Sequence, residues 1–402
     1  MALIVKKFGG SSVANAQRVK NVANIIAQEY KNGNEVVVVV SAQGDTTDDL
    51  IEKAKEINPN SPSKREMDML MTAGEQISIS LLALAIENLG LPVISLLGWQ
   101  AGFYTDSNYS AARIHRINPE RVLAELSKKN IVIVAGFQGL NKYDDITTLG
   151  RGGSDTSAVA LAAVLKADKC QIYTDVTGVF TADPRKISRA KMLNEITYDE
   201  MLELATLGAQ VLNNRSVEMA KKYNVELEVL SSFENKPGTI VKEKTKMEKM
   251  LISSVAKDDN VAQIAITELV DNPGVAFKLF NKLAQSKINV DNILQSIGRN
   301  KTKDISFIVS KDQCNDALNV VKSLEDSLGY KEVTSTDNIS KVSVVGAGME
   351  SHPGAAAKMF EALYEEGINI KMIATSEIRI SVIIDQKDGD RAVAAVHDAF
   401  IK

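Results

Sequence analysis

The sequence predicts an α/β protein in which a mainly parallel sheet, covered by helices on both faces, precedes a duplicated small domain. Strand-like and helix-like segments alternate through residues 1–245, as is typical of parallel βαβ units. The all-apolar run at 36–40 suits a central strand that is buried on both faces. A segment at 271–293 recurs without gaps at 351–373, which indicates duplication of a βαββαβ unit.

Each element of the first domain follows from a local pattern. Short apolar runs bounded by polar turns predict strands at 2–6, 35–41, 92–97, 130–135, 169–174 and 226–230. Helical periodicity predicts helices at 14–30, 72–89, 119–129, 155–165 and 216–222. The charged segment 242–249 has no apolar periodicity, so we expect a solvated linker that ends a domain spanning 1–245.

The duplicated part predicts two copies of one small domain. The first copy, 261–336, has strands at 261–268, 289–296, 304–310 and 331–336, with helices at 273–286 and 312–327. The second copy, 341–402, has strands at 341–347, 369–375 and 378–385, with helices at 353–366 and 388–400, but no final strand. We therefore expect the strand candidate at 250–256 to complete the second copy. The first copy would then be inserted in a discontinuous domain.

Composition limits the possible functions. The 402 residues are 45% hydrophobic and 24% charged, as in ordinary globular proteins, and the net charge of −4 gives no general attraction to nucleic acid. The two cysteines, Cys170 and Cys314, suggest no disulfide framework, and the three histidines have no zinc-ligand spacing. With neither a signal-peptide pattern nor a long apolar run expected to span a membrane, we expect a cytoplasmic protein without a metal site of its own.

Two glycine-rich turns carry the first chemical signal. The first reads Lys7-Phe8-Gly9-Gly10-Ser11-Ser12, and the second reads Gly150-Arg151-Gly152-Gly153-Ser154-Asp155-Thr156 and opens a helix. Glycines let backbone N–H groups close on a phosphate, and a helix N-terminus adds positive potential. Lysine supplies a mobile charge, whereas arginine supplies a fork that suits a carboxylate. This pairing predicts phosphoryl transfer to an acid.

Three further polar segments follow expected strands or open a helix, where open parallel sheets bind ligands. They are Ser41 to Thr47, Thr72 to Glu75 and Tyr173 to Arg185. Each segment alone is explained by helix capping or by an ordinary turn, but together the three favour a ligand-binding site. The sequence contains no GxxxxGK[ST] segment, which excludes a P-loop. Ser11, Ser12 and Ser41 lack a nearby histidine, which gives little support to nucleophilic serine catalysis.

The chain resembles the aspartokinases of the amino acid kinase family over essentially its whole length. KFGGSSVA, SAQGDTTDDL, TAGEQ, VAGFQG, TTLGRGGSDTSAVALAA and YTDVTGVFTADPR match the blocks of that family in order. The duplicated tail is similar to paired ACT regulatory domains. The resemblance implies an amino acid kinase fold followed by two ferredoxin-like ACT domains, and transfer of the ATP γ-phosphate to the β-carboxylate of L-aspartate with Mg²⁺.

The resemblance also assigns residues. The residues implied to hold ATP are Lys7, Gly9, Gly10, Ser11, Thr174, Asp175, Phe180, Asp183 and Arg185. Ser41 would lie near the transferred group, and the aspartate would be bound by Thr47, Glu75, Arg151 and Ser154. Chemically, Arg151 can grip the α-carboxylate while Glu75 pairs with the α-ammonium, and Asp155 would orient Lys7.

Regulation is expected from the two repeated turns before helices at 271–274 and 351–354. The effector would be lysine, threonine or both, bound between paired ACT domains of a homo-oligomer. Its expected contacts are Asp271, Gly274, Ala276, Asn289, Gln295, Asn369 and Ile370. Methionines at 247 and 250 leave open a separately translated regulatory subunit, although ordinary linker residues are the simpler interpretation.

Two departures from the family pattern affect the nucleotide contacts. Gln210 stands where many relatives have a lysine, and Phe180 stands where tyrosine is common. Two other functions stay open from the residues: a kinase for another acid such as glutamate, since Arg151 and Glu75 suit any α-amino acid, and a non-catalytic amino-acid sensor.

Overall fold

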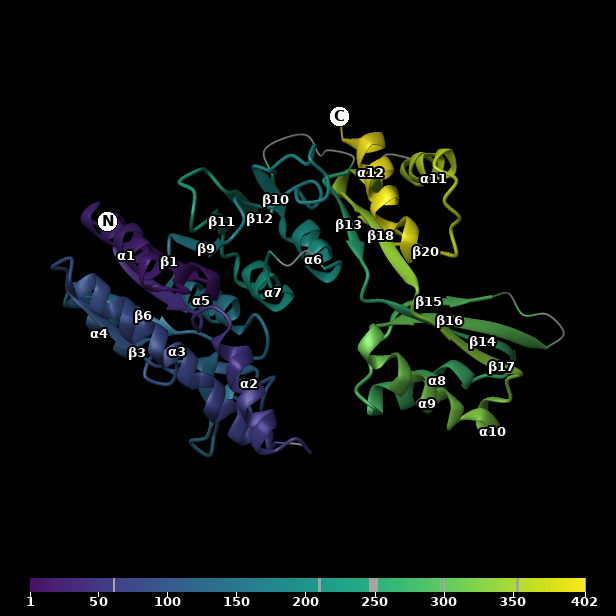
Figure 1. The fold of residues 1–402 in the computed structure, drawn as a ribbon, viewed down its shortest axis with the longest axis horizontal. Coiled ribbons are helices and arrows are strands. Elements are labelled where there is room, and N and C mark those ends of the chain that lie inside the picture. The colour runs from purple at the N-terminus through teal and green to yellow at the C-terminus, as the bar shows by residue number, and fades with distance from the viewer. Residues whose placement is uncertain are drawn as a thin grey trace. The chain divides into compact units, whose positions relative to one another are not determined.

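The computed structural model describes the chain except for residues 61, 209–210, 246–251, 297, 299–300, 352–353 and 402. The described chain forms two compact units (Figure 1). The first comprises Met1–Phe180 and Lys191–Glu248, and the second comprises Thr181–Ala190 and Lys249–Lys402. The first unit thus contains nearly all of the predicted kinase domain, but a ten-residue segment from its middle folds with the second unit.

The first unit is built on an eight-stranded sheet of order β10-β12-β11-β9-β1-β2-β6-β3. Its strands are β1 (Leu3–Phe8), β2 (Glu35–Val40), β3 (Val93–Leu96), β6 (Ile131–Ala135), β9 (Lys169–Thr174), β10 (Glu195–Thr197), β11 (Leu227–Ser231) and β12 (Thr239–Lys242). All neighbours are parallel except β11 and β12, so the edge pair β10 and β12 runs against the rest. This mainly parallel sheet confirms the predicted fold class.

Helices cover both faces of this sheet because its central strands are apolar on both sides. The α-helices of the first unit are α1 (Ala16–Lys31), α2 (Thr46–Ile57), α3 (Lys64–Glu87), α4 (Glu120–Ser127), α5 (Gly153–Leu165), α6 (Tyr198–Thr206) and α7 (Asn214–Tyr223), and a short 3₁₀ helix, η1, spans Gly10–Val13. Val36, Val38 and Val40 pack with α1 and α3 in one core cluster. The other face is contacted by α5, which lies along β1, β2 and β9.

A small second sheet of order β5-β4-β7-β8 adjoins α3. Its strands are β4 (Phe103–Thr105), β5 (Ile114–Ile117), β7 (Gln138–Leu140) and β8 (Ile146–Thr148). The first turn of α3 holds this sheet: Arg65 places Nε and Nη2 at 3.0 and 2.9 Å from Asp145 Oδ1. On the same carboxylate, Tyr109 Oη donates to Oδ2 at 2.7 Å.

Helix α3 is long and apolar enough to cross a membrane by length and composition, contrary to the expectation that no apolar run is long enough. Its composition has a different explanation here. Ile79, Leu82 and Ile86 pack into the core of the first unit. Ile77 and Leu84 lie on its exposed side, so the helix is apolar around much of its circumference.

The second unit contains two four-stranded sheets of order β15-β16-β14-β17 and β13-β18-β20-β19. Their strands are β13 (Ser254–Asp258), β14 (Ala262–Val270), β15 (Asp291–Gln295), β16 (Thr302–Val309), β17 (Glu332–Thr336), β18 (Ile339–Val345), β19 (Met372–Thr375) and β20 (Arg379–Asp385). The α-helices are α8 (Val275–Gln285), α9 (Cys314–Lys322), α10 (Glu325–Leu328), α11 (Ala355–Glu365) and α12 (Gly389–Phe400), with 3₁₀ turns η2 (Lys311–Gln313), η3 (Ala347–Ser351) and η4 (Gln386–Asp388).

The second sheet is built from distant parts of the chain. Strand β13, which follows the linker, pairs antiparallel with β18, with Ser254 opposite Val345. The strand candidate at 250–256 thus contributes to the second copy from residue 254 onward, while residues 250 and 251 lie outside the described residues. The first copy, β14 to β17, lies between β13 and β18 in the sequence and forms its own sheet.

Segment 181–190 is part of the core of the second unit, which differs from the predicted domain boundary of 1–245. Ala182 and Ile187 are buried in a cluster with Val255, Val342 and other residues of the β13–β20 sheet. The backbone carbonyl of Thr181 accepts a hydrogen bond from Val255 N at 2.8 Å. The position of this segment is determined by the tertiary packing of these two apolar side chains. No local sequence pattern predicts such packing.

Candidate active site

Four parallel strands end level with one another at one edge of the large sheet. Phe8 at the end of β1 is in register with Val40 of β2 and Tyr173 of β9, and Val40 is in register with Ala135 of β6. The loops that follow these strands therefore leave the same edge. The strand ends and loops at this edge carry Gly9, Gly10, Ser41, Thr174 and Asp175, five of the residues predicted to form the site, together with Gly136.

The loops after β1 and β2 interlock through their backbones. Gly44 N donates to Gly10 O at 3.0 Å, and Ser41 N donates to Phe8 O at 3.1 Å. A Cβ on Gly10 would lie 2.6 Å from the carbonyl oxygen of Ala42, a distance that side-chain carbons do not tolerate. Glycine at position 10 is thus required by close backbone approach, and the two loops form one rigid surface.

The end of strand β1 places one cation at this edge. Lys7 Nζ lies 2.7 Å from Asp155 Oδ1, and both side chains are largely shielded from solvent. Asp155 stands in the first turn of α5, so the helix carries its carboxylate to the end of β1. The structure therefore brings together the two residues predicted to be catalytic, 148 positions apart in sequence.

Glu75 is a buried carboxylate with one unmatched oxygen. Its side chain is 3% exposed, Ala42 N donates to Oε1 at 3.2 Å, and no described residue donates a hydrogen bond to Oε2. Burial raises the pKa of Glu75 to about 7, and the bond from Ala42 opposes this only in part. A buried acceptor without a donor is costly unless a ligand completes it, and an ammonium group would do so.

Helix α3 approaches the loop after β2 closely at this point. A Cβ on Gly74 would lie 2.8 Å from the Cβ of Ala42. The helix begins at Lys64 rather than at Thr72, so the expectation that Glu75 stands in a first turn is wrong. Glu75 instead projects from the middle of a rigid helix, and the helix dipole has no part in its environment. Thr47, expected in a loop, is half-buried in the first turn of α2.

Arg151 lies on an exposed turn whose backbone is held from several sides. Gly152 caps α5 with φ of 73°, a left-handed conformation that favours glycine. Asn213 Nδ2 donates to Arg151 O at 3.0 Å, and Arg215 Nη1 donates to Leu149 O at 3.0 Å. Burial lowers the pKa of Arg215, and the nearby Arg113 adds to that effect. Sequence reasoning missed Asn213 and Arg215, although they belong to the same GAQVLNNR segment as Gln210.

The other serines expected at the site lie on three different elements. Ser154 is buried in the first turn of α5, where a Cβ on Gly136 would come within 2.7 Å of its Cβ and Oγ. Ser11 lies in η1 and accepts a hydrogen bond on its carbonyl from Arg18 Nη1 at 2.7 Å. Ser41 is half-buried immediately after β2. Gln210 lies outside the described residues.

The expected nucleotide residues after β9 divide between the two units. Thr174 Oγ1 donates to Asp175 Oδ1 at 3.1 Å, and Phe180 bridges to Met192, all within the first unit. Asp183 and Arg185 belong to the second unit, where the guanidinium donates to both carboxylate oxygens at 3.0 Å. The Arg185 side chain holds the pKa of Asp183 below its ordinary value.

The expected effector residues lie near α8 and β15 in the first copy and before β19 in the second copy. Gly274 caps α8 with φ of 92°, Ala276 lies in its first turn, and Asp271 pairs with Lys303 at 2.9 Å. Gln295 ends β15 with an exposed side chain. Asn289, Asn369 and Ile370 precede β15 and β19 rather than lying in them, which corrects the predicted strand starts at 289 and 369. The strands begin only where ladder pairing with β16 and β20 becomes possible.

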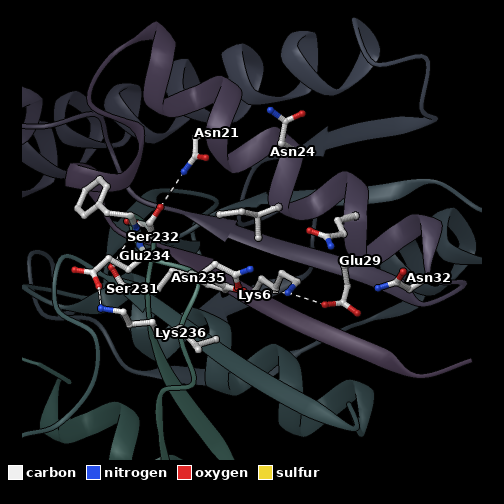
Figure 2. Close-up of a pocket in the computed structure, with 15 residues that line it drawn as sticks. Lys6, Asn21, Asn24, Glu29, Asn32, Ser231, Ser232, Glu234, Asn235 and Lys236 are labelled. Carbon is white, nitrogen blue, oxygen red and sulfur yellow. Dashed lines mark hydrogen bonds and ion pairs between the residues drawn. The ribbon is translucent and has the colours of Figure 1, made fainter. Parts of the chain in front are cut away.

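A polar cavity of about 450 Å³ lies between α1, β1 and the segment 231–236 (Figure 2). Its floor contains Lys6, which is 2% exposed and whose pKa is lowered by burial. Lys6 Nζ is 2.9 Å from Glu29 Oε2 and 2.5 Å from Gln171 Oε1. The buried ammonium is already paired, so this cavity lacks the unmatched group that marks Glu75.

Comparison with protein families supports the assignment of both units. Residues 2–231 match the amino acid kinase family, and residues 267–323 and 342–400 match the ACT domain. An aspartokinase from Bacillus sp. (strain MGA3) is 50% identical over 401 residues, covering 100% of this chain and 97% of the relative. An aspartokinase from Mycolicibacterium smegmatis is 50% identical over 407 residues, covering 100% and 96%.

The fold also matches a solved enzyme along its whole length. Aspartokinase III from E. coli, solved in complex with aspartate and ADP in its R-state, superposes with a TM-score of 0.85 at 25% identity. The match covers 100% of each chain.

Proposed function

This chain belongs to the aspartokinases of the amino acid kinase family and is an aspartate kinase, and we propose that it makes 4-phospho-L-aspartate from ATP and L-aspartate. This reaction would be the first step of lysine, threonine and methionine biosynthesis. One observation carries the choice of an amino-acid acceptor: the buried, unmatched oxygen of Glu75 beside the loop after β2. An α-ammonium group would supply the missing donor, while Arg151 would grip the α-carboxylate in two-pronged fashion.

The proposed mechanism requires alignment and charge neutralisation rather than a general base. The β-carboxylate of free aspartate has a pKa of about 3.9, so it is already an anionic nucleophile at neutral pH. Lys7 and the N–H groups of the Gly9–Gly10 turn would neutralise charge on the phosphoryl group as it transfers. Asp155, 2.7 Å from Lys7 Nζ, would keep that ammonium aimed at the nucleotide.

ATP would enter as its Mg²⁺ complex, and the ion would supply further charge neutralisation. Mg²⁺ in such sites uses one or two carboxylates besides phosphate oxygens and water. The site fits this requirement, because Asp155 places one buried carboxylate beside the Lys7 turn. Thr174, Asp175 and Phe180 would contact the rest of the nucleotide. The two buried, free cysteines agree with a reducing, cytoplasmic location.

Hydroxylamine trapping tests the activity directly. The purified protein is incubated with Mg²⁺, ATP, hydroxylamine and aspartate, glutamate or another amino acid, and the hydroxamate is measured. We expect hydroxamate from aspartate and not from glutamate. Equal rates with both acids would indicate a kinase of broader acceptor range. No hydroxamate from any acid, with amino-acid binding retained, would indicate a sensor instead of an enzyme.

Feedback regulation by lysine, threonine or both would act through the ACT domains of a homo-oligomer. The caps Gly274 and Gly354, with φ of 92° and 105°, start helices whose free N–H groups can take a carboxylate. Binding between protomers would favour one arrangement and inhibit by population shift. We expect inhibition of the parent by these amino acids, singly or together, and weaker inhibition of Gln295→Ala.

The matched control is Gln285→Ala, which removes an exposed glutamine from the end of α8. It should be inhibited as the parent is. A parent that neither amino acid inhibits would contradict the regulatory proposal, whereas unchanged inhibition of Gln295→Ala would move the effector site elsewhere.

A further inference from the structure

The carboxylate of Asp68 is fully buried, with 0% exposure, on α3. We propose that Asp68 is a positioning residue of the acceptor site, fixing the backbone that presents Arg151 to the α-carboxylate of aspartate. The inference rests on the proposed function, since it concerns the affinity for the acceptor. Asp68 itself would not touch the substrate.

Asp68 accepts hydrogen bonds from two separate segments. Ser110 N lies 2.9 Å from Oδ2 and 3.1 Å from Oδ1, and Ser110 Oγ lies 3.3 Å from Oδ1. Thr148 N donates to Oδ2 at 2.9 Å, and Thr148 Oγ1 donates to Oδ1 at 2.8 Å. The two backbone N–H groups need an acceptor, and the two hydroxyls can donate as well, so a carboxylate accepts from all four groups at once.

The two segments that Asp68 joins meet at the Arg151 turn. Thr148 ends β8, three residues before Arg151. A Cβ on Gly150 would lie 3.1 Å from Ser110 O, so the Ser110 loop lies directly against this turn. Ala112 N also donates to Thr148 O at 2.9 Å, which ties the loop to the strand a second time. Asp68 therefore supports the turn from both of its neighbours.

Ser110 adopts a backbone conformation that needs such support. Its φ is 67°, in the left-handed region, which is strained for a residue other than glycine. Such conformations persist where the surroundings hold them, and they gather at ligand sites. Here the carboxylate of Asp68 receives the N–H of the strained residue itself. Both the strained residue, Ser110, and the carboxylate of Asp68 that holds it thus lie close to the turn that carries Arg151.

Asp68 and Glu75 stand seven residues apart on one helix, nearly on the same face. Their spacing along the axis is about 10 Å. One helix thus carries the acceptor for the α-ammonium and the anchor of the turn that grips the α-carboxylate. This arrangement predicts that Asp68 controls aspartate affinity and leaves the nucleotide loops after β1 and β2 unaffected.

The test is steady-state kinetics of Asp68→Asn, with hydroxamate formation from aspartate as the readout. Asparagine keeps one acceptor oxygen where the carboxylate has two, and the charge-assisted character of these hydrogen bonds would be lost. We expect the KM for aspartate to rise roughly tenfold or more, the size expected for such a loss. The KM for ATP should stay within about twofold of the parent value, because the hydrogen bonds that the structure describes for Asp68 go to Ser110 and Thr148 and not to those loops.

Glu125→Gln is the matched control, since Glu125 is a buried carboxylate of α4 that accepts from Lys128 and Asn130 away from the site. It should leave both KM values unchanged even where it lowers the melting temperature. Thr148→Val removes one hydroxyl donor and keeps the backbone bond, so it decides the question by the same criterion if Asp68→Asn does not fold. We expect a smaller, aspartate-specific rise.

An aspartate KM within twofold of the parent, or an equal rise in both KM values, would overturn the positioning role. A parent enzyme that forms no hydroxamate from aspartate would instead contradict the proposed function. The two failures are therefore distinguishable in one set of assays.

Discussion

Replacing Glu75 with glutamine should stabilise the ligand-free enzyme at alkaline pH while removing its affinity for aspartate. Glutamine has the shape of the protonated acid and keeps an oxygen to accept from Ala42 N. It carries no negative charge for the substrate ammonium. The variant thus separates the cost of a buried charge from the function of that charge.

The size of the effect follows from the pKa. Burial raises the pKa of Glu75 from 4.5 to about 7 in the native state. Between these values the native state holds the proton that the unfolded chain has released, so stability falls as pH rises through this window. The loss reaches about 3 kcal/mol at pH 8 and is below about 1 kcal/mol at pH 5. Glutamine does not titrate, so it avoids this loss.

Guanidinium titrations of parent and Glu75→Gln at pH 5 and pH 8 measure this difference. The chain has one tryptophan, Trp99, in the first unit, so its fluorescence follows the unit that contains Glu75. We expect the variant to be more stable by about 3 kcal/mol at pH 8 and nearly equal at pH 5. A difference that is the same at both pH values would refute the assignment of a raised pKa to Glu75.

Four further outcomes are expected. Lys7→Ala should lower kcat by orders of magnitude, because its charge matters most in the transition state; a kcat within a few-fold of the parent would exclude that role. Arg151→Lys should raise the KM for aspartate far more than that for ATP, since lysine cannot make a two-pronged contact, and equal rises would remove it from the acceptor site. Gly152→Ala should lower the melting temperature and the aspartate affinity, because its Cβ would lie 2.4 Å from Asn213 Nδ2 at a φ of 73°; unchanged values of both would contradict this. A chain ending at Thr336 should aggregate or melt early, because β13 would lose its partner β18, and a soluble, cooperative fragment would count against the discontinuous domain.

The sequence predicted six of the eight strands of the large sheet, β1, β2, β3, β6, β9 and β11, because each is a short apolar run between polar turns. It missed β10 and β12 at one edge of this sheet. It missed the small sheet, since β4, β7 and β8 have three residues each, too few to show a period. It also placed the start of α3 eight residues late. The segment 64–71 is rich in charge, and Asp68 points into the protein, against the pattern of an amphipathic helix.

The candidate site was predictable where glycine and charge coincide in one turn, as at Lys7 and Arg151. It was not predictable where a residue acts through another. Asn213 and Arg215 hold carbonyls of the Arg151 turn, yet in sequence they are ordinary polar residues some 60 positions away. Only the fold brings them to the turn. Local rules fail most often at such sites, because function there overrides local preference.

The two buried carboxylates of α3 show how structure separates support from function. Both oxygens of Asp68 accept hydrogen bonds from Ser110 and Thr148, whereas Oε2 of Glu75 has no partner in the part of the chain that the structure describes. Removing the charge of a matched group leaves its donors unsatisfied, and removing that of an unmatched group relieves a burial cost. Asp68→Asn should therefore destabilise the free enzyme at pH 8, and Glu75→Gln should stabilise it, although both weaken aspartate binding. If Asp68 supports the site and Glu75 contacts the ligand, the two substitutions should change the free energy of unfolding in opposite directions, while both weaken aspartate binding. Changes in the same direction in both measurements would mean that the two carboxylates share one role.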